Sequence, residues 1–274
     1  MKNFKKLLAV LLAGLMLLTL VACGEKKDDN VDRRGALHAE NSMKFTSSAH
    51  QEHKEKANES NRETIYYNNL SAAILDLESG KIGSIFAEEH TAAYMVARNE
   101  NLTYINRDRT TNYSMMTLDS NKEVYDILNN AIKDMKADGT LDSLIANELK
   151  AYIETDPAPK DLPHFDGAKT IKVGITGDIP PMDFVAANGK AAGFNIALLA
   201  EIANRAQVNI ELVQIEAGAR PMALSSGKVD AVFWTLSVTC NTCGETIYEK
   251  IDGTLATETY CSANNTRIKL KSDK

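Results

Sequence analysis

Three short apolar runs between residues 169 and 239 restrict the fold of this chain more than any other feature. The runs cover residues 171–175, 210–215 and 229–234, and β-branched or aromatic side chains make up at least half of each, as in β-strands. Apolar side chains recur at helical spacing over 194–206, where Asn195 is expected to cap the helix, and Pro221 begins a shorter helix before the third run. Strands that alternate with helices in this way predict a parallel α/β sheet.

The loops that follow these strands are the expected place for a binding site. In an open α/β sheet, ligands bind beyond the carboxyl ends of the strands. The corresponding loops here cover residues 176–183, 216–220 and 235–239. We therefore expect a ligand-binding face built from these three loops, opposite a partner encoded elsewhere in the chain.

Composition excludes several other classes of protein. The chain has 274 residues, 44% hydrophobic and 25% charged, which is ordinary for a globular protein. The net charge is −6 and no basic cluster stands out, so nucleic acid is not an expected partner. The sequence lacks G-x-S-x-G, P-loop and H-E-x-x-H motifs, and we therefore expect no enzyme activity, catalytic residues, metal site or cofactor.

The first 23 residues have the pattern of an export signal. Lysines near the start precede an apolar run from Leu7 to Ala22, which is too short for a comfortable membrane span. The run ends in Leu-Val-Ala-Cys and resembles a bacterial lipobox, which implies cleavage before Cys23 and lipidation of that residue. A chance cysteine after an ordinary signal peptide is the alternative. The charged stretch that follows, to about residue 42, is expected to be a flexible tether.

An internal match links the two parts of the chain. Residues 77–86 read LESGKIGSIF and residues 224–233, 147 positions later, read LSSGKVDAVF. The same offset places the strand expected at 64–67 on residues 211–214. Other elements expected in the first half are a strand at 44–48, a polar helix or loop at 49–60, a helix at 70–78, and strands at 102–105 and 113–118. Agreement through a strand, a helix, a glycine turn and a second strand favours two related α/β lobes. Two independent helix–glycine–strand units are the alternative.

The segment between the two lobes reads as helices followed by a stiff linker. Apolar residues at helical spacing predict an amphipathic helix over 122–136, and a second helix is expected from Thr140 to about residue 152. Residues 156–163 hold three prolines in eight positions, which predicts an extended connection between domains.

The second half of the chain resembles the bacterial extracellular solute-binding proteins of family 3, the polar amino acid type. The resemblance rests on the strand 171–175, the sequence DIPPMDF at 178–184, NGK at 188–190, GFN at 193–195 and SGKVDA at 226–231. It implies a two-lobed, periplasmic-binding-protein-like α/β fold, with parallel-rich sheets, flanking helices and a hinge. Similarity to later parts of that family is found in residues 65–69, 75–86 and 94–101 and in the sequence KADGTLDSL at 136–144.

The lobe order is unusual for the family, since the part resembling its second lobe comes first. A circular permutation explains the order, and a truncated tandem of two incomplete copies is the alternative. The predicted organisation is a signal peptide at 1–22, a tether at 23–42, a lobe resembling the family's second lobe at 43–118, closing helices at 119–155, a proline-rich linker at 156–168, a lobe resembling the family's first lobe at 169–262, and a tail at 263–274.

The resemblance also implies which residues contact a ligand. The family's aromatic contact beside the Pro-Pro turn is replaced by Ile179, and its carboxylate-binding arginine by Thr242. We expect Arg220 to take over carboxylate binding, because it lies between a strand and a helix on the binding face. The full set of predicted ligand-binding residues is Glu88, Asp178, Ile179, Met182, Phe184, Arg220, Trp234, Thr235, Ser237 and Thr239.

Three cysteines remain if Cys23 carries lipid. Cys240 and Cys243 form a C-x-x-C sequence, whereas Cys261 stands alone. A surface disulfide or free thiols are the simplest interpretations. A redox role lacks the usual surrounding sequence, and a zinc site lacks a second C-x-x-C.

These expectations combine into one predicted function. The chain is expected to be a monomeric, lipid-anchored binding protein on the extracellular face of the cell membrane. It would close around a small polar solute, an amino acid or a carboxylate-like compound, and deliver it to an ABC transporter permease. A sensor or interaction lipoprotein with a degenerate cleft is the first alternative, and a dehydratase built on the same fold is the second.

Overall fold

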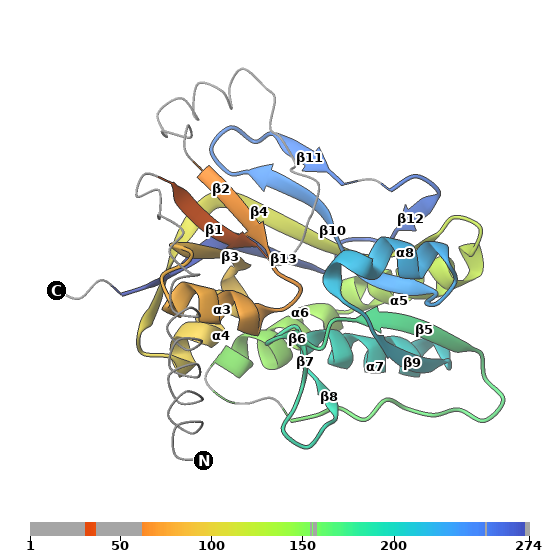
Figure 1. Cartoon of the computed structure of the whole chain (residues 1–274). Helices are drawn as coiled ribbons and strands as arrows, with labels where there is room; N and C mark the ends of the chain where they lie inside the picture. Colours follow the sequence, from red (N-terminus) through yellow and green to blue (C-terminus); the bar gives the residue numbers. More distant parts are fainter. Residues whose placement is uncertain (1–30, 37–61, 154, 156–157, 250, 272–274) are drawn as a thin grey trace, which may run out of the picture. The chain divides into compact units, whose positions relative to one another are not determined.

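Figure 1 shows the computed structural model of the chain, which describes residues 31–36, 62–153, 155, 158–249 and 251–271. The predicted signal peptide, Cys23, and the strand and helix or loop expected at 44–60 lie outside these residues. Residues from Asp32 onward cluster in one compact unit. Within the described part of the chain, no helix is long and apolar enough to cross a membrane.

Two parallel groups of strands are joined by antiparallel strands into one sheet (Figure 1). The strand order is β2-β1-β3-β13-β4-β10-β5-β9. β1 pairs in parallel with β2 and β3, and β5 pairs in parallel with β9 and β10. The strands are β1 (Asp32–Ala36), β2 (Arg62–Tyr66), β3 (Ser84–Glu88), β4 (Leu102–Leu118), β5 (Thr170–Ile175), β9 (Asn209–Gln214), β10 (Ala231–Cys240) and β13 (Cys261–Leu270).

Each parallel group forms a lobe with its own apolar core. In the β1–β3 lobe, helices α3 (Leu70–Glu78) and α4 (Glu89–Arg98) pack on strand residues such as Ile85 and Ile268. In the β5–β10 lobe, α5 (Lys122–Ala137), α6 (Thr140–Leu144) and α7 (Phe194–Ala206) contribute to the core around Val173 and Phe233. The fold is therefore a two-lobed α/β fold, as the sequence predicts.

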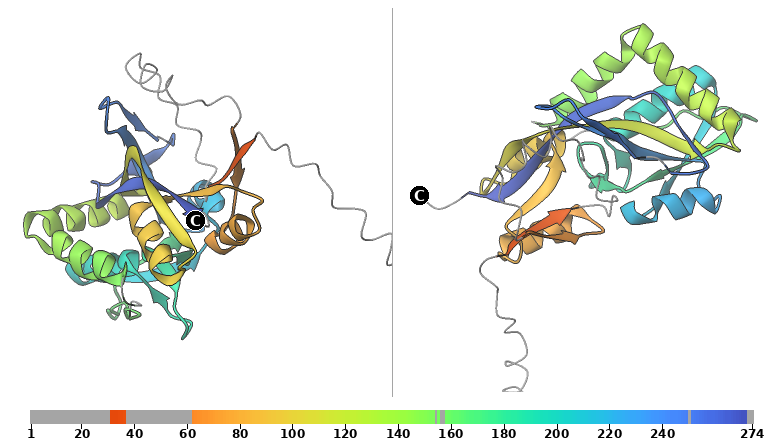
Figure 2. Two further views of the ribbon diagram at one scale, coloured as in Figure 1. Left: turned by 90° about the vertical axis from the view of Figure 1, so that its left-hand side faces the viewer. Right: turned by 90° about the horizontal axis from the view of Figure 1, so that it is seen from above.

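Helices cover both faces of the β5–β10 sheet. Helix α8 (Arg220–Ser225) packs with Val232 and Trp234, whereas α5 belongs to the core that contains Ala231 and Phe233. Alternate residues of a strand point to opposite faces, so α5 and α8 lie on opposite sides of the sheet. The view from above in Figure 2 shows this arrangement.

The internal match of the sequence corresponds to a repeated structure. Strand β2, helix α3 and strand β3 match β9, the helical segment 217–225 and the start of β10 at the same offset of 147 residues. The order β2-β1-β3 in one lobe also equals the order β9-β5-β10 in the other. The prediction of two related α/β lobes is confirmed in these elements.

Strand β4 connects the lobes and is longer than the sequence suggests. We expected separate strands at 102–105 and 113–118, but residues 102–118 form one strand of 17 residues. β4 pairs with β13 along its first part and with β10 along its second, and both partners shift register once, at Asn264/Thr266 and at Thr235/Ser237. Such irregularities bend strands locally, which makes these two places candidate hinges.

Two predicted boundaries are wrong because small and polar residues form strands. The range predicted as a tether contains β1, the central strand of its lobe, where Gly35 leaves room for the side chains of Ile82 and Tyr67. The range predicted as a tail contains most of β13, where Ala263 and Thr266 are buried. Backbone pairing on both sides holds these strands, so their side chains carry little hydrophobic signal.

Smaller elements complete the structure. A π-helical segment and a short 3-10 turn continue α6, and a 3-10 turn precedes α8. Their bounds and those of the remaining strands are Ile145–Lys150, Ala151–Ile153, Ala217–Ala219, β6 (Asp178–Ile179), β7 (Asp183–Val185), β8 (Ala191–Ala192), β11 (Thr246–Tyr248) and β12 (Thr254–Ala256).

Gly193 fixes the start of α7 against the Pro-Pro loop. It has a φ of 109° and is the N-cap residue, so the expected capping by Asn195 is wrong. The Phe194 N–H donates to the Pro181 carbonyl at 3.0 Å, and the Asn195 N–H donates to the Met182 carbonyl at 2.8 Å. A Cβ atom at position 193 would lie 2.5 Å from the Met182 carbonyl oxygen, so the site requires glycine.

The substitution Gly193→Ala tests this packing. It should lower the free energy of unfolding by about 3 kcal/mol, because strain at a glycine-only conformation and a backbone clash act together. Chemical denaturation measures the change. Gly218→Ala is the matched control, since no atom lies within 4 Å of its Cβ position, and its effect should stay within about 0.5 kcal/mol. Equal effects of the two substitutions would contradict the assignment.

Candidate functional site

A cavity of about 50 Å³ lies where strand ends of the two lobes meet. Glu88 ends β3 in one lobe, whereas Arg220 begins α8 in the other and Ile179 ends β6, the short strand after β5. The cavity therefore lies at the carboxyl ends of parallel strands, the expected place for a ligand. Its lining residues are Glu88, Tyr113, Ile179, Met182, Asp183, Asn195, Arg220, Phe233, Trp234, Thr235 and Tyr260.

Asp183 is a structural carboxylate in the cavity wall. It is 2% exposed, and its Oδ1 accepts from the Thr176 N–H at 3.0 Å, the Thr176 hydroxyl at 2.7 Å and the Gly177 N–H at 2.8 Å. Its Oδ2 accepts from Asn195 Nδ2 at 2.8 Å. Four hydrogen bonds stabilise the buried negative charge and hold the loop after β5 against α7.

Three other buried polar atoms of the cavity residues have no hydrogen-bond partner in the protein. They are Nε of Arg220, Nε1 of Trp234 and Oδ1 of Asn195. Two of them are donors and one is an acceptor. Buried polar groups are almost always hydrogen-bonded in folded proteins, so a cluster of exceptions at one cavity points to a bound molecule that satisfies them.

Local structure places Arg220 in this wall. The 3-10 turn at 217–219 turns the chain after β9, and Pro221 stands in the first turn of α8. Ala223 and Leu224 pack into the core beneath, which fixes the helix, and Arg220 is only 9% exposed. A guanidinium group held in this position suits two-point binding of a carboxylate.

The aromatic side of the cavity is rigid and uncharged. The Tyr260 ring lies 6.1 Å from the Phe194 ring and 5.7 Å from the Phe233 ring, measured between centroids. Burial raises the pKa of Tyr260 well above its ordinary value, so the phenol stays protonated. A ligand in this cavity would face a neutral phenol.

A second, open hollow of about 390 Å³ lies beside Asp178 and also includes residues of both lobes. The Asp178 carboxylate accepts a 3.0 Å hydrogen bond from the N–H of Leu70, the first residue of α3. A negative charge at this position also meets the positive end of the helix dipole. The lining residues are Asn68, Asn69, Thr176, Asp178, Gln214, Ile215 and Glu216.

An aromatic contact joins the lobes near the same place. The rings of Tyr94 in α4 and Phe184 in β7 lie 6.3 Å apart, and the Arg98 guanidinium lies 3.6 Å from the Tyr94 ring centroid. Phe184 therefore contacts the opposite lobe. Together with the bond from Asp178 to Leu70, this contact holds the lobes against each other in the described conformation.

The predicted ligand-binding residues divide into three groups by position. Those in the cavity wall are Glu88, Ile179, Met182, Arg220, Trp234 and Thr235. Asp178 lines the outer hollow, and Phe184 contacts α4. Ser237 Oγ accepts from Asn112 Nδ2 at 3.0 Å and Thr239 bonds Thr246 at 2.9 Å, so these two hydroxyls lie within the sheet, outside both hollows.

Sequence reasoning did not find several wall residues. Tyr113 and Tyr260 meet because the Tyr260 N–H donates to the Tyr113 carbonyl at 2.9 Å, a long-range contact without a local signal. Asn195 could have been predicted as a wall residue, since it belongs to the sequence GFN at 193–195, which carries part of the resemblance to the family. Thr242, which stands at the family's arginine position, lies in the turn after β10, where its N–H donates to Asp108 at 3.2 Å.

Asp178 makes stability depend on pH. Burial raises the pKa of its carboxyl group, while the Leu70 N–H acts in the opposite direction. Because the pKa of Asp178 is higher in the folded than in the unfolded chain, its protonation stabilises the folded state. This contribution to the free energy of unfolding is complete below the ordinary pKa of about 3.9 and is lost as the pH rises through the pKa of the folded state.

The substitution Asp178→Asn should therefore stabilise the chain at pH 7. Asparagine keeps an oxygen that can accept from the Leu70 N–H but carries no charge to bury. The advantage should disappear below about pH 4, where Asp178 itself is protonated. Urea denaturation at both pH values measures this, with the exposed Asp252→Asn as control. A destabilised variant at pH 7 would show that the charge on Asp178 is favourable.

Comparisons with known proteins find one family model, which covers part of the β5–β10 lobe. Residues 171–244 match the model of bacterial extracellular solute-binding proteins, family 3. The match begins on β5 and ends in the turn after β10, so it includes Arg220 and Trp234. No curated protein matches the chain.

Several solved structures are similar at low identity. One is the ligand-binding component of an ABC-type import system from Staphylococcus aureus, with 11% identity, a TM-score of 0.44, and 88% of this chain and 66% of that chain covered. A second is the GluR0 ligand-binding core in complex with L-glutamate, with 10% identity, a TM-score of 0.42, and 89% of this chain and 86% of that chain covered. A third is a putative L-cystine ABC transporter from Listeria monocytogenes, with 11% identity, a TM-score of 0.41, and 89% of this chain and 84% of that chain covered. The chain thus spans just under two thirds of the length of the first of these structures.

The sequence motifs, the carboxyl-end position of the cavity and the family match point to the same part of the chain. Residues 171–244 are therefore similar to the bacterial extracellular solute-binding proteins, family 3.

Proposed function

We propose that this chain binds a small polar solute with a carboxylate group, such as an amino acid, in the cavity between its lobes. We further propose that it is the substrate-binding component of an ABC importer. In this proposal Cys23 carries a lipid that anchors the chain to the outer face of the cell membrane, and a monomer delivers the solute to the permease. The role is binding, without catalysis.

The unpartnered atoms of Arg220, Trp234 and Asn195 are the observation that carries the proposal. A buried polar group without a partner costs about 1–3 kcal/mol, and more if it is charged. A carboxylate could accept from both Arg220 and Trp234, and an ammonium group could donate to Asn195. Glu88 lines the same cavity and adds a negative side chain from the opposite lobe.

Binding requires the lobes to separate and close again. A cavity of about 50 Å³ has room for a few water molecules but is far below the 300–1,000 Å³ typical of ligand pockets. The bends in β10 and β13 allow an opening movement, with β4 as the shared strand. Closure is then favoured by contacts that a solute makes with both lobes at once.

A sensor or interaction protein is the second candidate, and one observation favours it. Asp178 already bonds the first N–H of α3 across the lobes, and the apolar residues Ile179 and Met182 line the cavity. A chain that closes on its own side chains needs no solute to stay closed. In that case the membrane anchor would hold the closed form at the cell surface, where another protein could bind it.

The substitution Arg220→Met separates these functions. A thermal-shift screen with amino acids and small carboxylates first identifies a solute, and calorimetry then gives its Kd. We expect Arg220→Met to weaken binding by about 10–100-fold, because a hydrogen bond to a charged group contributes about 1.5–3 kcal/mol. Stability without solute should be equal or higher, since a buried donor without a hydrogen-bond partner is removed together with the charge that carries it.

Lys228→Met is the matched control, because Lys228 is an exposed cation in the same lobe. It should leave both solute affinity and stability unchanged. Unchanged affinity of Arg220→Met would contradict the carboxylate assignment. The absence of any solute for a folded protein would favour the sensor.

A further inference from the structure

The hairpin at the end of β10 brings two cysteines together outside the cavity. Its turn reads Cys240-Asn241-Thr242-Cys243-Gly244 and leads into β11. The Cys240 N–H donates to the Glu245 carbonyl and the Gly244 N–H donates to the Cys240 carbonyl, both at 2.8 Å. Gly244 has a φ of 73°, which permits this tight reversal. The turn is therefore closed at both ends of the C-x-x-C sequence.

The two cysteines pack against each other inside this turn. Cys240 is fully buried, and Cys243 is half-buried and packs against it beside Val238 and Ile247. After burial, the groups that act on the pKa of the Cys240 thiol include the backbone N–H groups of Cys243 and Thr242 and the side chain of Cys243. Both residues are thiols in this structure, and neither thiol must cross the protein to reach the other.

Asp108, from β4, supplies a carboxylate at the buried thiol. The distance from Cys240 Sγ to Asp108 Oδ2 is 3.5 Å, and the same oxygen accepts from the Thr242 N–H. Burial raises the pKa of the Cys240 thiol, so it stays protonated until an acceptor takes the proton. The carboxylate of Asp108 is in position to be that acceptor.

We propose that Cys240 and Cys243 form a reversible dithiol–disulfide pair, with Cys243 as the more exposed member that reacts first with a small disulfide such as oxidised glutathione. In the described part of the chain, this turn included, no three His, Cys, Asp or Glu side chains gather in a way that could hold a metal ion. An oxidising compartment outside the cytoplasm, where the proposed function places the chain, favours the disulfide.

The reaction balances in two exchange steps. Cys243, after losing its proton, attacks one sulfur of oxidised glutathione, forms a mixed disulfide and releases one glutathione thiol. Cys240 then gives its proton to Asp108 and attacks the Cys243 sulfur. This attack breaks the mixed disulfide, and the second glutathione leaves with the proton from Asp108. Two electrons pass from the two cysteines to one glutathione disulfide.

The bond would act on the strand that carries part of the cavity wall. Trp234 and Thr235 lie on β10, and Cys240 ends the same strand beyond the register shift at Thr235/Ser237. A disulfide across residues 240–243 closes the hairpin covalently and fixes the far end of this strand. Oxidation should thus restrict the bend that the proposed opening movement uses.

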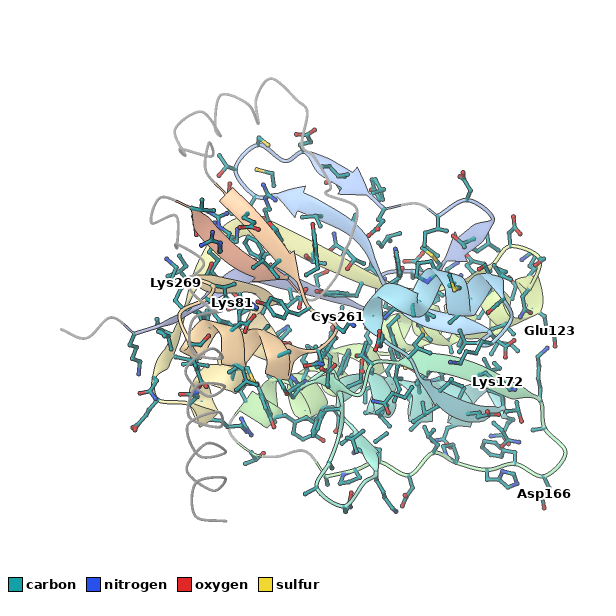
Figure 3. The ribbon with its side chains drawn as sticks, viewed as in Figure 1. Lys81, Glu123, Asp166, Lys172, Cys261 and Lys269 are labelled. Atoms are coloured by element: carbon teal, nitrogen blue, oxygen red, sulfur yellow. The ribbon has the colours of Figure 1, made fainter. Side chains whose placement is uncertain are left out.

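Mass spectrometry of the full-length chain tests the proposal directly. After exposure to oxidised glutathione and alkylation of the remaining thiols, we expect the peptide with Cys240 and Cys243 to lose two hydrogens and to take up no alkyl group. Cys261, labelled in Figure 3, is the internal control. It is 3% exposed on β13, burial raises its pKa to about 12, and it should remain a thiol.

Three variants give distinct readouts. Cys240→Ser should accumulate a glutathione adduct on Cys243, whereas Cys243→Ser should leave the buried Cys240 unmodified. Asp108→Asn keeps an oxygen for the Thr242 N–H, and it should slow the loss of the mixed disulfide and steepen the pH dependence of that step. Alkylation of both Cys240 and Cys243 in the wild-type chain after oxidation would overturn the proposal. Pairing of either residue with Cys261 would overturn it as well.

Discussion

Strand β4 is the constraint on which both lobes depend. Its 17 residues pair with β13 in one lobe and with β10 in the other, so the two parallel groups of strands are joined through one backbone. Buried peptide groups must keep their hydrogen bonds, and a strand paired on both sides cannot shift without breaking many of them. The candidate hinges are therefore the places where β10 and β13 change register, at Thr235/Ser237 and Asn264/Thr266. The cavity lies beside the first of these places, since Thr235 is one of its wall residues.

Two charged side chains of the cavity differ in whether their polar atoms have hydrogen-bond partners in the protein. Asp183 accepts four hydrogen bonds and builds the wall, whereas Arg220 is nearly as buried and has an unpartnered Nε. A protein gains no stability from a buried donor without an acceptor. In the proposed function, this contrast distinguishes a structural group from a binding group. The unpartnered donor belongs to a cation, and the proposed ligand therefore carries an anionic group.

The sequence predicted the elements whose side chains have a strong pattern. Helix α3 was expected over 70–78, as observed, and α5 was expected to within one residue of its end. Strands β1 and β13 were missed because Gly35, Ala263 and Thr266 carry almost no hydrophobic pattern, although backbone pairing from both sides holds them. Arg220 could be placed in the cavity because a strand end, a turn and Pro221 are local signals. Tyr113 and Tyr260 could not, because only pairing between distant strands brings them there.

Fluorescence of Trp234 is the most direct measure of the central claim, that a solute binds between the lobes. Trp234 is the only tryptophan of the chain, and its indole N–H lines the cavity without a partner. Titration with a solute found by calorimetry should change its emission with one-site saturation, at the same Kd as the heat signal. Binding of the solute without any change in Trp234 emission would place the site elsewhere and contradict the account.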